Sequence, residues 1–459
     1  MNSFTMEIDR SSRLTIYEQL YEYISGAIRA GRLEPGERLP SKKALASHLG
    51  ISCNTVETAY SMLCQEGYVY SRPRSGYYVA LMEKGFGVTG AVYSSAGITP
   101  PEYRYDFMTN TVDAASFPFR TWAKLGKEVL YNGEALLSGG SWQGDDELLN
   151  SLCKYLREFR AVNAVPSQIV IGAGMEYLLM LLCRILPQDI SFAVEDPGYI
   201  KTPAILSGCG RRLHYISLDS DGMNAAALSA CGASAACITP SHQFPTGAVM
   251  PIARRMELLR WVSAAPERYI LEDDYNSEFN FVGRPIPSLQ GMDNRRVIYI
   301  STFSRILAPS IRIAYMVLPP ELLSRSQDVL KNYSSTVSRF DQHTLCRFID
   351  GGYLGRHLNR MKTLYRRRRD FLLELLSPHA QRLKLSISGG NAGLHLLVSG
   401  SAETTARILA RAEERSIRVT RMSDYYHAFS GAETTIVLGY AGMNDETLSA
   451  AVSELFEGL

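Results

Sequence analysis

Apolar residues near the start of the chain recur at the spacing of an α-helix. Between Thr15 and Ala30 they share one face of the predicted helix: Ile16, Leu20, Ile24 and Ile28. Gly31 ends this helix, because glycine readily adopts backbone conformations that a helix does not use.

Two shorter helices follow, and each has a serine at its start that can cap it. Ser41 precedes the predicted helix 42–49, which Gly50 ends. Ser52 precedes a third helix, whose apolar face consists of Val56, Ala59, Tyr60 and Leu63. Two short helices joined by residues 50–52 have the proportions of a helix-turn-helix. Residues 68–79 then predict two strands around a basic, glycine-bearing tip, which is the form of a wing.

This arrangement predicts a DNA-binding surface. The second helix of such a pair enters the major groove with its first turn against the base edges. Basic side chains neutralise phosphates, which supplies most of the affinity and its salt dependence. The predicted contact residues lie at the caps, on the third helix and in the wing: Ser41, Lys42, Lys43, Ser52, Cys53, Asn54, Thr55, Thr58, Arg72, Arg74 and Gly76. The alternative, a protein-binding helical module with solvated basic residues, is disfavoured because cap, turn, helix and wing occur in order.

A second domain is indicated by short apolar runs that alternate with helical stretches from Gln168 onward. The predicted strands are 169–171, 190–194, 236–238, 269–271 and 297–300, and helices 175–186 and 252–264 lie between them. Such alternation predicts an α/β fold with a mainly parallel sheet covered on both faces. Ligands bind at the carboxyl ends of the strands in these folds, so the residues after each run are candidate site residues. Residues 81–105, rich in glycine and ending in Pro100–Pro101, predict a flexible linker before this domain.

Composition narrows the class of protein. A hydrophobic content of 46% and a charged content of 20% are those of a soluble globular protein. No apolar stretch is long enough to span a membrane, and the first residues carry no export signal, so we expect a cytoplasmic protein. Its 8 cysteines form no C-x-x-C pair, which favours reduced thiols and no metal site. The net charge of +2 is too small to indicate nucleic acid by itself.

The amino-terminal motifs resemble those of the GntR family of bacterial regulators. The resemblance rests on Pro40–Ala46, Leu49–Ser52, Asn54–Val56, Glu66–Gly67 and the basic wing. Two positions depart from the family pattern: Lys43 stands where arginine is usual, and Cys53 stands where arginine is frequent. Lysine meets a phosphate only as a point charge, and Cys53 removes a contact, so we expect the DNA sequence that is read to differ from that of a typical member.

The segments after the strands resemble fold-type I pyridoxal-phosphate enzymes, and the full chain is similar to the MocR class of GntR regulators. The resemblance implies that Gly174, Met175 and Arg312 hold the cofactor phosphate. It also implies that Tyr199 stacks on the pyridine ring, that Asp273 pairs with the ring nitrogen, and that Tyr275 bonds the phenolic oxygen.

Arg305 follows Thr302–Phe303–Ser304, where the resemblance implies the lysine that forms the Schiff base. Arginine stays protonated and its nitrogens are delocalised, so we expect no covalent cofactor at this position. Lys201 stands where related regulators often have arginine, and the strand 435–442 lacks the arginine that usually grips a carboxylate, although Arg421 is a possible substitute. These further departures favour natural divergence over an introduced lysine-to-arginine substitution.

The sequence therefore predicts a non-catalytic transcriptional regulator. Its domains are a winged helix-turn-helix (10–80), a linker (81–105), a large aminotransferase-like domain (106–376) and a small α+β domain (377–459). We expect a homodimer that binds double-stranded operator DNA and a small effector, with an amino acid or a vitamin B6 compound as the candidate classes. Pyridoxal phosphate would bind non-covalently, and neither metal nor membrane is expected. The alternatives are an active aminotransferase with an accessory DNA-binding domain, which Arg305 opposes, and a degenerate scaffold protein. The cluster Arg366–Arg369 is expected to be a solvated helix face.

Overall fold

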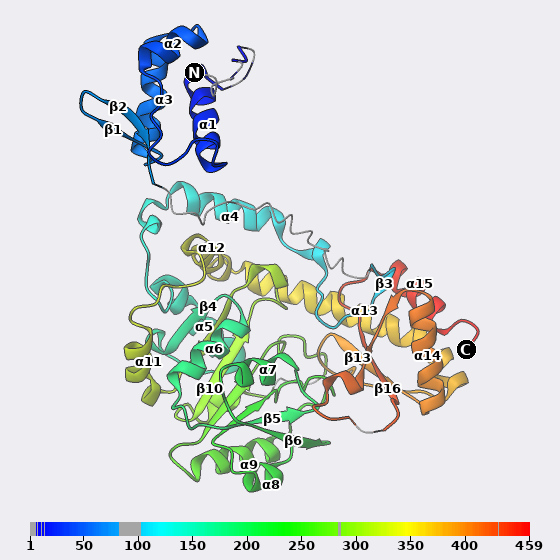
Figure 1. The fold of residues 1–459 in the computed structure, drawn as a ribbon. Helices are drawn as coiled ribbons and strands as arrows, with labels where there is room; N and C mark the ends of the chain where they lie inside the picture. The colour runs from blue at the N-terminus through cyan, green and yellow to red at the C-terminus, as the bar shows by residue number, and fades with distance from the viewer. Residues whose placement is uncertain are drawn as a thin grey trace. The chain divides into compact units, whose positions relative to one another are not determined.

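The computed structural model describes residues 6, 8–10, 12, 14–81, 102–282, 286–429 and 431–459 (Figure 1). The chain divides into two compact units, Met1–Pro100 and Pro101–Leu459, and each is treated by itself below. Most of the predicted linker, residues 82–101, lies outside the described residues. The linker and the three predicted boundaries between segments stay predictions.

The first unit is a winged helix-turn-helix, as the apolar pattern predicts. Its elements are α1 (Ile16–Arg29), α2 (Lys42–Leu49), α3 (Cys53–Gln65), β1 (Val69–Arg72) and β2 (Gly76–Val79). Both predicted caps form: the Ser41 hydroxyl accepts a hydrogen bond from Ala44 N at 3.2 Å, and the Ser52 hydroxyl accepts one from Thr55 N at 3.0 Å. Gly50 ends α2 with a φ of 64°, a conformation that costs other residues strain.

The core of this unit is made by the residues of the predicted helix faces. Leu20 and Ile24 of α1 pack with Val56, Tyr60 and Leu63 of α3, and all are buried. The wing strands pair antiparallel, and the pairing register sets Arg72 opposite Gly76.

The second unit is built on an eight-stranded sheet of order β4-β11-β10-β9-β8-β5-β6-β7. Its strands are β4 (Ile169–Gly172), β5 (Phe192–Asp196), β6 (Leu213–Asp219), β7 (Gly222–Met223), β8 (Ala235–Ile238), β9 (Tyr269–Asp273), β10 (Val297–Thr302) and β11 (Ala314–Val317). The central pairs from β10 through β9, β8 and β5 to β6 are parallel, whereas β11 pairs antiparallel with both β4 and β10. The predicted mainly parallel sheet is confirmed.

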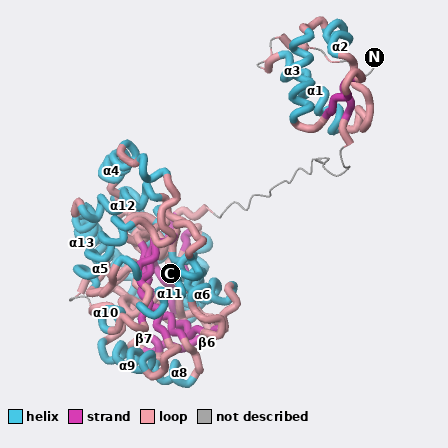
Figure 2. Tube along the Cα trace, turned by 90° about the vertical axis from the view of Figure 1, so that its left-hand side faces the viewer, coloured by secondary structure: helices cyan, strands magenta, loops and turns pink. Residues whose placement is uncertain are grey.

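Helices cover both faces of the sheet, which explains why the strands are continuous apolar runs. Alternate residues of β4 face opposite layers: Ile169 and Ile171 pack in one core and Val170 in another. The first core contains residues of α4 (Phe119–Tyr131), α5 (Asp146–Arg160) and α12 (Arg339–Asp350); the second contains residues of α6 (Met175–Ile185), α7 (Lys201–Gly208) and α11 (Leu323–Leu330). Residues of α8 (Ala225–Ala230), α9 (Ile252–Ser263) and α10 (Leu289–Met292) form a third core with the remaining strand faces. Figure 2 shows the strands enclosed between α5, α12 and α13 on one side and α6 on the other.

A smaller sheet of order β12-β13-β16-β15 follows the long helix α13 (Tyr353–Leu383). Its strands are β12 (Ser386–Ser388), β13 (His395–Ser399), β15 (Thr420–Arg421) and β16 (Thr435–Gly439), and α14 (Ala402–Glu414) and α15 (Asp445–Phe456) pack against it. The short strand β3 (Tyr105–Asp106) pairs with β14 (Ile417–Arg418). The predicted boundary between residues 376 and 377 falls inside α13, which runs from α12 to α15 (Figure 1).

The basic cluster on α13 corrects one prediction. Arg366 and Arg367 are exposed, as expected of a solvated face. Arg368 is buried and donates to Ala441 O at 2.6 Å, and Arg369 donates to Gly390 O at 2.8 Å. Two of the four arginines therefore anchor α13 to neighbouring segments. The pattern could not show this, because the partner carbonyls lie far away in the sequence.

Among the described residues no helix is long and apolar enough to cross a membrane. The same residues contain no group of three or more histidine, cysteine or acidic side chains placed to hold a metal ion.

A buried ion pair fixes the end of β9. The Arg160 Nε atom lies 2.7 Å from Asp274 Oδ2, and the two side chains are 4% and 0% exposed. Tyr299 also donates to Asp274 Oδ2 at 2.6 Å. Burial alone would raise the pKa of Asp274, but Arg160 and the hydroxyl donors hold it below its ordinary value. Asp274 is thus a charged carboxylate in the core of the unit.

Removing one partner of this pair should destabilise the unit strongly. Arg160→Met leaves Asp274 charged and unpaired, so we expect a loss of about 3–5 kcal/mol in the free energy of unfolding. The measurement is urea unfolding followed by tryptophan fluorescence, since Trp122, Trp142 and Trp261 all lie in this unit. Arg157→Met, at an exposed position of the same helix, should cost less than about 0.5 kcal/mol. Equal losses for the two variants would contradict a structural role for the pair.

Candidate ligand-binding and DNA-binding sites

A cavity of about 240 Å³ opens at the carboxyl ends of the parallel strands. Its lining includes six of the seven residues predicted to meet a cofactor: Met175, Tyr199, Asp273, Tyr275, Arg305 and Arg312. The structure therefore brings together side chains that are separated by more than a hundred positions in the sequence. The other lining residues come from strand ends, loops and helix starts: Met108, Thr109, Asn110, Glu176, Ile200, Lys201, Thr239, Phe244, Thr302, Ser304, Pro309 and Tyr425.

Gly174, the seventh predicted residue, lies directly beside the cavity at the start of α6. Its φ is 97°, and a Cβ atom there would lie 2.2 Å from Arg312 Nη2. Only glycine therefore lets the arginine lie across this backbone. Arg312 Nη2 also donates to Ala173 O at 3.1 Å, so the guanidinium sits at the amino end of α6.

Glu176 places its own carboxylate where the sequence analysis expected the phosphate of a ligand. Its Oε2 atom lies 2.8 Å from Arg312 Nη2, and its Oε1 atom lies 3.0 Å from Lys201 Nζ. Burial would raise the pKa of Glu176, but hydrogen bonds from Arg312, its own amide and Lys201 lower it to about 2. Glu176 is a site residue that the sequence analysis missed. A carboxylate in the first turn of a helix is favourable for structural reasons alone, so its presence gave no distinctive signal.

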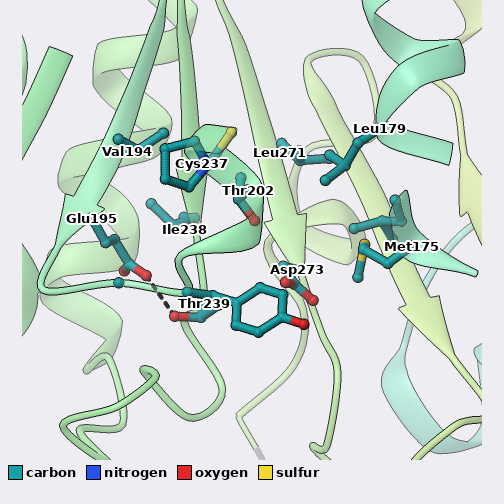
Figure 3. A pocket seen from close by; sticks show the side chains of 14 residues that line it. Met175, Leu179, Val194, Glu195, Thr202, Cys237, Ile238, Thr239, Leu271 and Asp273 are labelled. Carbon is teal, nitrogen blue, oxygen red and sulfur yellow. Dashed lines mark hydrogen bonds between the residues drawn. The ribbon is translucent and has the colours of Figure 1, made fainter. Parts of the chain in front are cut away.

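Two acidic residues, Asp273 of β9 and Glu195 of β5, lie on the two strands that flank β8, at the floor of the site (Figure 3). Asp273 ends β9, and its Oδ1 atom is buried with no hydrogen-bond partner among the described residues. Burial first, and then the charges of Asp274 and Glu195, raise the pKa of Asp273 to about 8. Glu195 of β5 accepts a hydrogen bond from the Thr239 hydroxyl at 2.6 Å, and burial raises its pKa to about 7.

A small apolar space adjoins these carboxyl groups. Its volume is about 30 Å³, and its apolar lining includes Val194, Cys237, Leu271 and Ile300. Figure 3 shows Thr239 between Glu195 and Asp273, with the strand side chains Val194, Cys237 and Ile238 on one side. This apolar floor is the cause of the raised pKa values, because a charge there loses its hydration.

Aromatic rings form the walls of the cavity. Phe244 meets Tyr199, Tyr275 and Tyr425 edge to face, at centroid distances of 5.9, 6.2 and 4.9 Å. The Tyr275 hydroxyl is hydrogen-bonded to His242 Nδ1 at 2.9 Å. Burial, His395 and Arg305 lower the pKa of His242 well below its ordinary value, so this histidine is neutral. A cavity with such walls suits a flat ring.

Arg305 follows β10 and projects to the cavity. It donates through Nη1 to Thr109 O, and its guanidinium carbon lies 5.9 Å from the centre of the Tyr275 ring. Arg305 has no ion pair with any acidic side chain of the described residues. Arg421, by contrast, is 58% exposed, pairs with Asp424 at 3.6 Å and does not line the cavity, so the structure does not place it as a substitute carboxylate grip.

Some of the predicted DNA-contacting side chains are exposed, and some are engaged within the unit. Cys53, Asn54 and Thr58 are exposed on α3 and Lys43 on α2, and the Thr58 hydroxyl donates to Asn54 O at 3.0 Å. Thr55 Oγ1 and Ser52 Oγ lie 2.8 Å apart within the cap. Lys42 Nζ lies 2.6 Å from Glu57 Oε1, so a phosphate would have to compete for this lysine.

The wing presents two arginines. Arg72 stacks on Tyr78 and Tyr70, with its guanidinium carbon 4.7 and 5.3 Å from the ring centres. Arg74 has a φ of 61° at the tip, next to Gly76 with a φ of 120°. The two exposed guanidinium groups therefore stand at and beside the turn of the hairpin.

Comparison with known proteins identifies both units. Residues 16–79 match the family "Bacterial regulatory proteins, gntR family". The chain is 35% identical to the HTH-type transcriptional regulator YdeL of Bacillus subtilis, over 98% of this chain and 97% of that protein. It is 33% identical to the probable rhizopine catabolism regulatory protein MocR of Rhizobium meliloti, over 98% and 94%. The chain belongs to the MocR-type transcriptional regulators of the GntR family.

Further similarities support the architecture of this MocR-type regulator. The pyridoxine biosynthesis regulator PdxR of Corynebacterium glutamicum is 29% identical over 97% of this chain and 96% of its own length. An archaeal alanine:glyoxylate aminotransferase matches 78% of this chain and 90% of its own, with a TM-score of 0.69 and 21% identity. A kynurenine aminotransferase of Pyrococcus horikoshii matches 77% and 89%, with a TM-score of 0.66 and 23% identity. The second unit of the regulator therefore has an aminotransferase fold.

The raised pKa of Asp273 makes a prediction about stability. The pKa of about 8 in the folded protein exceeds the ordinary 3.8, so the folded state holds a proton that the unfolded chain releases. Stability from this carboxyl is full at low pH and is lost as the pH rises through 8. Asp273→Asn cannot ionise, so its free energy of unfolding relative to wild type should increase by about 1 kcal/mol or more between roughly pH 5 and pH 8.

Urea unfolding at the two pH values measures this difference. Asp328→Asn, at an exposed position of α11, is the control and should change the free energy of unfolding by less than about 0.5 kcal/mol at both. A difference between Asp273→Asn and wild type that does not vary with pH would contradict the raised pKa.

Proposed function

We propose that this regulator binds operator DNA through its helix-turn-helix and senses a small molecule in the cavity, without catalysing transamination. The observation that carries the proposal is Arg305 at the cavity wall, in the place of the Schiff-base lysine. A guanidinium stays protonated and delocalised, so it cannot supply the neutral amine that such chemistry needs. An active aminotransferase is therefore disfavoured, although the fold is shared.

The cavity residues otherwise fit pyridoxal phosphate. The unpartnered Asp273 Oδ1 atom is placed to accept a ring N–H, and the glycine cradle at Gly174 leaves room for Arg312 beside the amino end of α6. The cofactor, when bound, supplies an electron-withdrawing pyridine ring. In the proposed site Met175 and Arg312 hold its phosphate, Tyr199 stacks on the ring, and Tyr275 bonds the phenolic oxygen. For Arg312 and Lys201 to bind the phosphate, their ion pairs with Glu176 must break. Ligand binding is therefore linked to a local rearrangement of Glu176.

A homodimer is the proposed working form, located in the cytoplasm with its DNA. Four large apolar side chains are exposed on α4 and in the turn that follows it: Phe119, Leu130, Tyr131 and Leu137. Where exposed apolar surface is contiguous it marks an interaction site, so this segment is the proposed dimer contact. A two-fold dimer would carry paired helix-turn-helix units to two half-sites of an operator.

The DNA-binding half is tested on operator DNA found by footprinting upstream of the regulator's own gene. Asn54→Ala should weaken binding by about 1–3 kcal/mol and relax the preference at one base pair, because Asn54 is exposed on the first turn of α3. Arg74→Ala should weaken all sequences alike and reduce the salt slope by about 1. Arg325→Ala, exposed on α11 of the other unit, is the control for a lost arginine. Unchanged affinity for both wing and helix variants would overturn the assigned surface.

The non-covalent half is tested with Arg305→Lys. This variant restores an amine at the cavity wall, so added pyridoxal phosphate should give a visible absorbance band and, after borohydride reduction, a covalent label at position 305. Wild type and Arg421→Lys should give neither, since Arg421 lies outside the cavity. A covalent label at Lys201 of the wild-type protein would refute the proposal that pyridoxal phosphate binds non-covalently.

A further inference from the structure

The guanidinium of Arg305 has few protein partners. A guanidinium carries several N–H donors in a planar fork, and the described residues offer Arg305 one acceptor, Thr109 O. Its other close neighbour is the face of Tyr275. Burial lowers the pKa of Arg305, and the nearby tyrosine side chains act in the opposite direction. A cation at a cavity wall with unused donors calls for an acceptor from the ligand.

The charges that line the cavity do not balance. The titratable groups in the lining, tyrosines aside, are Glu176, Lys201, Asp273, Arg305 and Arg312. Glu176 offsets one of the three cations. Asp273, whose pKa is raised to about 8, is mainly protonated at neutral pH and offsets little. The cavity is therefore positively charged, and Arg305 is the cation without a counter-charge in contact.

Arg305 and the other two cations occupy separate parts of the site. Arg312 and Lys201 share Glu176 and sit at the amino end of α6. Arg305 contacts Thr109 and Tyr275 instead. A ligand anion that meets Arg305 is therefore separate from any that meets Arg312 and Lys201.

We propose that the ligand is a planar nitrogen-containing aromatic carboxylic acid, and that Arg305 binds its carboxylate. This inference rests on the proposed sensing function and names the chemical class of the effector. The ring lies among Tyr199, Phe244, Tyr275 and Tyr425, and the ring nitrogen faces Asp273 Oδ1. The carboxylate stands where a Schiff-base enzyme binds an aldehyde carbon. Its two oxygens match the arginine fork, whereas an aldehyde offers one neutral acceptor.

The test uses three probes that differ only at carbon 4 of one pyridine ring: 4-pyridoxate, pyridoxal and pyridoxine. Calorimetric titration of the full-length protein should show 4-pyridoxate binding at least about tenfold more tightly than pyridoxine, as expected of a charge-assisted hydrogen-bond pair. Arg305→Gln should reduce this preference to within about twofold, and Arg305→Lys should keep part of it because the charge remains. Arg421→Gln is the matched control and should keep the full preference, since Arg421 is exposed and outside the cavity.

The relative affinities of the wild-type protein for the three probes test the inference even if a variant fails to fold. Equal binding of the three probes, a preference for pyridoxal, or a carboxylate preference that survives in folded Arg305→Gln would each overturn it. In those cases a ligand-dependent change in operator affinity would leave the proposed function standing. Binding of none of the probes by a protein that still binds its operator would overturn both this inference and the vitamin B6 part of the proposed function.

Discussion

The ion pair between Arg160 and Asp274 is the constraint on which the cavity depends. It places a full negative charge in the core of the unit, one residue beyond the end of β9. Because Asp273 precedes it, the two carboxyl groups are forced close together in a poorly hydrated region. Burial of Asp273, and then the charge of Asp274, raise the pKa of Asp273 to about 8. The charged Asp274 thus adds to the effect of burial on the neighbour that faces the ligand.

In the proposed function, two residues shift this aminotransferase fold from catalysis toward ligand recognition. Arg305 removes the reactive amine but keeps a positive charge at the same wall. Glu176 provides an internal carboxylate for Arg312 and Lys201. The rest of the site, from the glycine cradle to the tyrosine walls, has the chemistry expected of a cofactor pocket. A fold used in this way needs only to bind, because binding energy can shift the population of conformations that contact DNA.

Much of this organisation could be predicted from the sequence, because it is encoded locally. In the first unit, the helix boundaries are marked by the caps Ser41 and Ser52 and by Gly50, and in the second unit the buried strands appear as continuous apolar runs. Strand β11 was missed because its apolar run directly follows a site segment and gives no boundary signal. Glu176, the Lys42–Glu57 pair and the buried Arg368 were missed for a different reason. Each depends on a partner distant in the chain, and spacing along a sequence carries no information about such contacts.

The carboxylate of Glu176 affects the measured binding affinity of any anionic ligand. Since Arg312 and Lys201 already hold an anion, an incoming phosphate or carboxylate exchanges one ion pair for another instead of creating a new one. The observed affinity is then the difference between two similar attractions, and it is weaker than the contacts alone would give. If the ligand must displace the Glu176 carboxylate, the strength of the Glu176 ion pairs sets the ligand concentration at which the regulator responds. That set point can be moved by changing one residue that never touches DNA.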